Sequence, residues 1–179
     1  MHFSFVSGDP ALDLAATIGY RRTEPVDLVQ GPADLERWVR ACEELPAEIA
    51  ADLESFDAAI TLREAVYSLA LARTRGHPFD PGDVEVLNAA ANGPALALEL
   101  VNDGMCITGG IRAALAHVAR SGITVLADAT TPIKECARPE CTRLYLDRSR
   151  GARRTWCGMA ECGNRVKAAA YRARRRAAG

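Results

Sequence analysis

The chain has 179 residues, of which 49% are hydrophobic and 25% charged, a composition typical of a globular protein long enough to bury a core. No apolar run approaches the roughly 18 residues of a membrane span, and the first residues lack the basic stretch of a secretory signal, so we expect a soluble cytoplasmic protein. The net charge of −1 hides a split, because residues 1–133 carry a balance of −10 and residues 134–179 a balance of +9.

Helical patterns dominate the first two thirds of the chain. Apolar residues recur every three to four positions, which predicts helices over residues 11–18, 32–42, 46–73, 83–91 and 111–128. Residues that start helices support these assignments: Asp9 before Pro10 opens the first, Pro46 the longest, and Asp83 caps the fourth. Residues 20–31 are expected to form a loop.

The period changes from helical to alternating after residue 95. Apolar residues alternate over 96–101, and Asn102-Asp103-Gly104 is a strong turn signal, so we predict a β-hairpin that returns through 105–108. A second short strand is expected at Leu144-Tyr145-Leu146. Thr131-Pro132 marks the expected boundary between a first domain, residues 1–132, and a second, residues 133–179.

Four of the six cysteines form two matched pairs within the second domain. Cys136-x4-Cys141 is followed, after fifteen residues, by Cys157-x4-Cys162. Two close pairs joined by a short arm are typical of one structural zinc ion held by four thiolates in a closed tetrahedron. Disulfides or free thiols are the alternatives. Cys42 and Cys106 lie in apolar surroundings and are expected to be small buried hydrophobes.

Basic residues near the cysteines have a simple electrostatic explanation. Four thiolates on Zn²⁺ leave a net charge of −2, which cations can neutralise. The candidates for this role are Lys134, Arg138, Arg153, Arg154 and Arg165. Trp156, next to Cys157, is expected to pack beside the metal site. The fold class that follows is α+β, with a mostly helical first domain that carries a β-hairpin and a small zinc finger that ends in a basic helix.

These residues resemble a known family. Cys162-Gly163-Asn164-Arg165 is the signature of CGNR zinc fingers, and residues 144–147, 149–150, 153–157 and Lys167 resemble the same pattern. In that family the finger follows an ABATE domain, which residues 8–17 and 62–67 resemble, although Ala16 stands where the family usually has Asn. The resemblance implies a bacterial stress-related transcription regulator whose first domain receives a signal or small ligand.

The segment after Cys162 is rich in Ala and Arg, which are strong helix formers. Spacing places Arg165, Arg172 and Arg176 on one face of the helix. The cations that could contact the phosphates of duplex DNA are Arg153, Arg154, Arg165, Lys167, Arg172, Arg174, Arg175 and Arg176. A solvated terminal helix explains the same charge without any partner.

The alternative function is a small-molecule sensor or a protein-interaction module in which the finger only stabilises the fold. An enzyme is not expected, because the histidines His2, His77 and His117 are scattered and no nucleophile with a matching base or glycine-rich phosphate loop is present. The sequence leaves the oligomeric state open. Loss of the metal is expected to unfold mainly residues 133–179.

Overall fold

The computed structural model describes residues 2–102 and 104–177, and it is an α+β fold. Its strands form two-stranded antiparallel sheets that pair β1 with β2, β3 with β4 and β5 with β6. In chain order the elements are α1 (Pro10–Ala15), β1 (Ile18–Gly19), β2 (Val26–Asp27), α2 (Pro32–Ala41), α3 (Leu53–Arg75), α4 (Pro81–Ala91), β3 (Ala97–Val101), β4 (Gly104–Thr108), α5 (Ile111–Ala127), β5 (Ile133–Glu135), β6 (Leu144–Leu146), the π-helical turn η1 (Met159–Gly163) and α6 (Asn164–Ala177). None of the described helices is long and apolar enough to cross a membrane.

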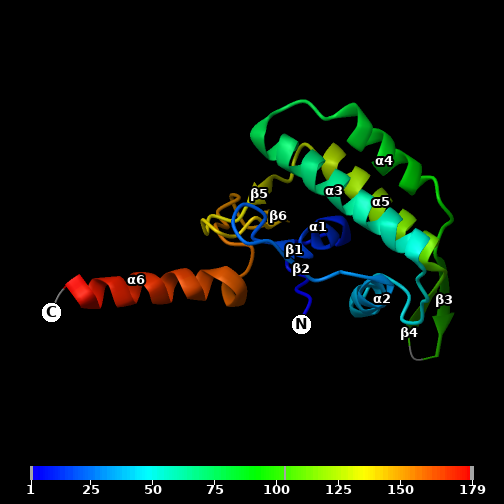
Figure 1. Cartoon of the computed structure of the whole chain (residues 1–179), viewed down its shortest axis with the longest axis horizontal. Helices are drawn as coiled ribbons and strands as arrows, with labels where there is room; N and C mark the ends of the chain where they lie inside the picture. The colour runs from blue at the N-terminus through cyan, green and yellow to red at the C-terminus, as the bar shows by residue number, and fades with distance from the viewer. Residues whose placement is uncertain (1, 103, 178–179) are drawn as a thin grey trace.

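The helical body is built around α3, which α1, α4 and α5 contact (Figure 1). Side chains such as Leu12, Leu62 and Val118 fill the space between these helices and are fully buried. Gly122 interrupts the apolar face of α5 because α1 lies directly against it. A Cβ atom at Gly122 would lie 3.1 Å from the Cβ of Ala11, so a small residue permits the close approach of the two helices.

The predicted helix starts are confirmed in some places and wrong in others. Asp9 caps α1 by accepting a hydrogen bond of 2.9 Å from the amide of Ala11, as expected from the Asp-Pro pair. The longest helix does not begin at Pro46, because Asp52 and Ser55 form a reciprocal capping box that sets its start at Leu53. The cap of α4 is Asp80 rather than Asp83.

Two further segments differ from the sequence-based expectation. The first helix ends at Ala15, so Ile18 and Gly19 form a strand instead. This strand pairs with Val26–Asp27 inside the segment expected to be a loop. The predicted hairpin is confirmed, with Leu98 opposite Ile107 and Leu100 opposite Met105; Asp103 of its turn lies outside the described residues.

The cysteine-rich segment completes the core of the helical body. Ile133, Leu144 and Leu146 from β5 and β6 belong to the same buried cluster as the residues of α1 and α3. The N-terminal segment also binds β6, because the amide of Leu146 donates a hydrogen bond of 2.8 Å to the carbonyl oxygen of Ser7. We therefore expect loss of the metal to destabilise the helical body as well as residues 133–179.

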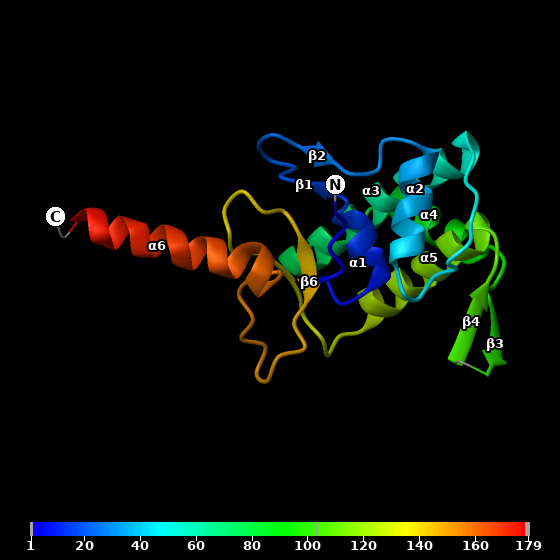
Figure 2. The same cartoon turned by 90° about the horizontal axis from the view of Figure 1, so that it is seen from below.

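The last helix is attached differently. Figures 1 and 2 show that α6 begins beside the segment of β5 and β6 and extends away from the rest of the molecule. Its described side chains are exposed except for Val166, which is half-buried. Packing against the body therefore does not account for the position of α6, and among the described elements its extensive contact is with η1.

Asp13 gives the stability of the body a pH dependence. Burial raises its pKa to about 6, although the amide of Ser7 donates a hydrogen bond of 2.9 Å to its carboxylate and Arg143 acts in the same lowering direction. A carboxyl whose pKa is higher in the folded state stabilises the fold below pH ~4, and this contribution is lost as the pH rises to ~6.

We therefore expect Asp13→Asn to stabilise the protein at pH 8 by about 1–3 kcal/mol, because Asn can still accept from Ser7 but carries no buried charge. The gain should shrink as the pH falls from about 6 to 4. Denaturant unfolding of both proteins at each pH measures it. An advantage that is equal at pH 8 and pH 4 would contradict this role of Asp13.

Candidate metal centre and nucleic-acid interface

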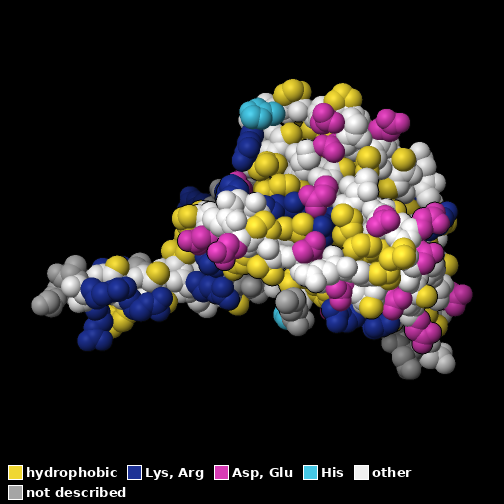
Figure 3. Space-filling view, viewed as in Figure 1, with side chains coloured by type: hydrophobic (Ala, Val, Ile, Leu, Met, Phe, Trp, Pro, Cys, Tyr) yellow, Lys and Arg dark blue, Asp and Glu magenta, His cyan; other side chains and the backbone are white. Residues whose placement is uncertain are grey.

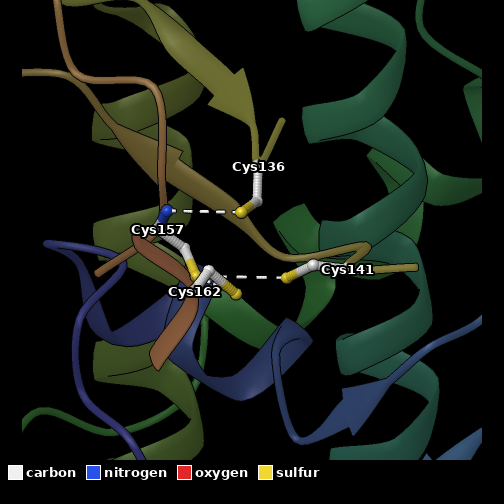
Figure 4. Close-up of side chains that lie close together, drawn as sticks. All are labelled: Cys136, Cys141, Cys157 and Cys162. Atoms are coloured by element: carbon white, nitrogen blue, oxygen red, sulfur yellow. Dashed lines mark hydrogen bonds between the residues drawn. The ribbon is translucent and has the colours of Figure 1, made fainter. Parts of the chain in front are cut away.

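Four cysteines from distant parts of the second segment meet at one point (Figure 4). Cys136 follows β5, Cys141 lies in the loop before β6, Cys157 follows the long connection after β6, and Cys162 lies in η1. Their sulfur atoms all lie within 4.8 Å of one another. Cys141 is half-buried and the others are buried.

The distances between sulfur atoms fit zinc. The Sγ atom of Cys157 lies 3.9 Å from that of Cys141 and 3.6 Å from that of Cys162. A tetrahedron with Zn–S bonds of about 2.3 Å has edges of about 3.8 Å. These separations are far longer than a disulfide bond of about 2.05 Å, and all six cysteines are free thiols. The predicted ligand set is confirmed: the four cysteines form a site for one structural zinc ion.

Backbone hydrogen bonds hold the cysteines in place. The amide of Cys157 points at the Sγ of Cys136 over 3.5 Å, and the amide of Cys162 donates to the carbonyl of Gly158 at 3.0 Å. Gly163 leaves room for the packed side chains around the turn, because a Cβ there would lie 3.1 Å from the Cδ1 of Trp156. Trp156 packs against the cysteine cluster, as the sequence predicts.

Four ionised thiols at these distances need a cation to offset their charge. Hydrogen bonds from Cys141 and Cys157 lower the pKa of the Cys136 thiol. The same contacts, together with burial, raise the pKa of Cys157, and that of Cys141 rises to about 12. Four thiolates this close repel one another, and a bound dication removes that cost. The chemistry of the donor set therefore also fits Zn²⁺.

The basic residues expected to neutralise the site divide into different roles. Arg138 comes closest, with its Nη1 atom 4.0 Å from the Sγ of Cys162. Lys134, which is half-buried, instead forms an ion pair of 2.7 Å with the buried Asp147. Arg165 lines a small cavity of about 100 Å³ beside Cys157 and Cys162. Arg138 and Arg165 thus lie where they can offset the charge of a zinc tetrathiolate.

Arg154, one of the candidate nucleic-acid contacts, has its guanidinium bound inside the protein. Its guanidinium donates to the carbonyl oxygens of Trp156 at 2.9 Å and Val6 at 2.8 Å, and also to that of Cys157. It also lies 4.5 Å from the ring centre of the fully buried Tyr145. These contacts use the donors that a phosphate would need, so Arg154 joins the metal site to the N-terminal segment instead.

A pair of neighbouring arginines tests this assignment. Arg154→Ala should destabilise the protein by about 2–4 kcal/mol, because it leaves several carbonyls without their charged donor. Arg153 is exposed, and Arg153→Ala should change stability by less than about 0.5 kcal/mol. Thermal unfolding of the zinc-loaded variants measures both. Equal effects at the two positions would show that Arg154 has no special structural role.

The remaining candidate cations lie on or near α6, on the surface. Arg165, Lys167, Arg172, Arg174, Arg175 and Arg176 are exposed, and none of them forms an ion pair with an acid among the described residues. At a rise of about 1.5 Å per residue, Arg165 and Arg176 lie about 16 Å apart along one face. Figure 3 shows Lys and Arg side chains gathered on α6, whereas Asp and Glu lie mainly over the helical body. The charge split in the sequence is therefore also a split in space.

Comparison with known proteins agrees with this architecture. The family model ABATE, described as "Putative stress-induced transcription regulator", matches residues 8–129, and the model of the CGNR zinc finger matches residues 133–175. A search of curated proteins found no significant match.

Proposed function

Because this chain belongs to the ABATE family and ends in a CGNR zinc finger, we propose that it is a transcription regulator that binds duplex DNA through α6 and the finger. The observation that carries the proposal is α6, an exposed helix whose described cations are not paired with acids of the described chain. It extends away from the acidic body (Figures 1 and 3). We place the protein in the bacterial cytoplasm, where thiols stay reduced.

The zinc site would hold the first turn of α6 in a fixed position relative to the body. Cys162 lies in η1, which runs directly into α6 at Asn164, so zinc ligation holds the first turn of the helix. Arg165, Arg172 and Arg176, along about 16 Å of one face, can contact successive phosphates. Lys167 and Arg174 lie on the opposite face of α6, where they can reach the other wall of a groove. Contacts of this kind position a protein on DNA without reading its sequence, so we assign Arg165, Lys167, Arg172, Arg174, Arg175, Arg176 and the exposed Arg153 to the phosphate backbone.

The helical body would supply the regulatory input rather than catalysis. A partly open cavity of about 260 Å³ lies between α3, α4 and the start of α5, lined by apolar residues such as Leu62, Ala90 and Leu115. Glu54 and Arg112 pair across its rim at 2.5 Å. This cavity supports the second candidate, a small-molecule sensor, either on its own or as the input of the DNA-binding protein.

A binding titration distinguishes the candidates. Full-length zinc-loaded protein is mixed with labelled duplex DNA and, separately, RNA at about 50 mM salt, where phosphate contacts are strongest. The proposal predicts saturable binding to the DNA duplex. Binding to neither nucleic acid would reject the regulator and favour the sensor, whose mark would be a ligand-dependent rise in the melting temperature.

A further inference from the structure

The β3–β4 hairpin carries an apolar face that the described part of the chain leaves largely uncovered. Paired residues of a hairpin share a face, so Leu98, Leu100, Met105 and Ile107 lie on one side. Leu98 is 65% exposed, Leu100 94% and Met105 63%. In both cartoon views the hairpin extends beyond the helices, at the end of the molecule opposite α6 (Figures 1 and 2).

Exposure of this apolar face to water is unfavourable for the stability of the hairpin. Two strands alone are marginally stable in water, and a sheet normally buries its apolar face. A contiguous exposed apolar patch of this kind typically marks an interaction site. The opposite face is mixed, because Glu99 and Thr108 lie there beside Ala97, Val101 and Cys106, and it carries fewer large apolar side chains. The asymmetry between the two faces therefore indicates a partner on the apolar one.

The base of the same face forms a groove. Leu96, Leu98, Met105 and Ile107 line it together with residues of α5 and of the segment after α2, and its volume is about 340 Å³. Leu100 does not line the groove but projects beyond it near the turn. A protruding apolar side chain and an apolar hollow thus lie side by side on one surface of one chain.

The charges around the groove are of both signs. Glu43, Glu44, His117 and Arg120 all line it. Arg120 also donates hydrogen bonds to the carbonyl oxygens of Gly93 and Pro94 in its own chain. Glu44 lies 3.9 Å from the Nε2 atom of His117. A two-fold interface must be complementary to itself, so that a group on one copy meets its counterpart on the other. A protrusion with a hollow, and acids with bases, satisfy this requirement.

We propose that the occupant of this face is a second copy of the chain. The two hairpins pack apolar face to apolar face across a two-fold axis, and Leu100 of each copy enters the groove of the other. Glu43 and Glu44 of one copy then lie near Arg120 of the other. Because α6 extends from the opposite end of the molecule, such a dimer leaves both basic helices accessible.

The test is the mass of the full-length zinc-loaded protein in solution. Sedimentation equilibrium should give a species of twice 19.2 kDa at about 50 µM. Leu100→Lys should weaken the dimer at least about 100-fold, because it buries a charge in each of two grooves. Val101→Lys is the matched control, since Val101 is adjacent, also exposed and on the opposite face, and Leu100→Met should keep the dimer.

The results separate cleanly. Circular dichroism and zinc content must be equal in all variants, so that a change in mass reports the interface and not the fold. Dissociation by Leu100→Lys alone supports the proposal. A wild type that is monomeric at about 100 µM would overturn it, as would a Leu100→Lys variant that stays dimeric or a Val101→Lys variant that dissociates equally.

Discussion

Cys157→Ser is expected to release the zinc and to destabilise the entire chain by at least about 3–5 kcal/mol, because zinc-binding energy in small modules is folding energy. The sequence alone places this damage mainly in residues 133–179. The structure extends it to the body, since Leu144 and Leu146 belong to the core that α1 and α3 share. A loss of this size is a large part of the 5–15 kcal/mol by which typical domains are stable.

Two readouts measure this result. Elemental analysis should find about one zinc per wild-type chain and none bound tightly by the variant. Hydrogen exchange should show weaker protection in α1 and in the part of α3 that faces β5 and β6. Cys106→Ser is the control, because Cys106 lies in the hairpin away from the four ligands. Unchanged protection of α1 after zinc loss would mean that the finger unfolds alone.

The second large effect concerns α6. Replacing four of its arginines with Ala should lower the affinity for duplex DNA at least about 100-fold at 0.1 M salt, since each one contributes a phosphate contact. The replaced residues are Arg172, Arg174, Arg175 and Arg176. Ala keeps the helix intact because it has the highest helix propensity. Zinc content should not change, because none of these side chains is part of the metal site.

A charge-matched variant controls for net charge. It replaces four exposed arginines of the body with Ala, namely Arg37, Arg40, Arg75 and Arg112. Both variants lose four positive charges, but only the first loses them on α6. If the two weaken DNA binding equally, the effect comes from overall charge, and α6 is not the interface.

Local signals predicted most of the elements. The Asp9-Pro10 start, the Asn102-Asp103-Gly104 turn and the helix from Ile111 depend on neighbours in the sequence, and α1, the hairpin and α5 appear where these signals lie. The start of α3 was predicted wrongly because residues 46–52 have an acceptable helical pattern. The capping box of Asp52 and Ser55 decides the start instead.

Contacts between distant segments could not be predicted in this way. Cysteine spacing identifies the metal ligands, because the geometry of zinc restricts the spacing itself. No local pattern shows that Arg154 reaches the carbonyl of Val6, which lies 148 positions earlier. Local sequence does not predict β5 either, because this strand is only three residues long and is stabilised by its pairing with β6. The role of each arginine near the zinc therefore emerged only from the packing.

The salt dependence of DNA binding tests the central claim most directly. The affinity of full-length zinc-loaded protein for duplex DNA is measured between about 50 and 200 mM salt, beside the α6 variant and its charge-matched control. With about four to six phosphate contacts the logarithm of the binding constant should fall with a slope of roughly −4 to −5, and the loss of four arginines from α6 should flatten it by about 3.6. The control should keep the wild-type slope. A slope near zero in the wild type, or the same slope after the arginines of α6 are removed, would contradict the account.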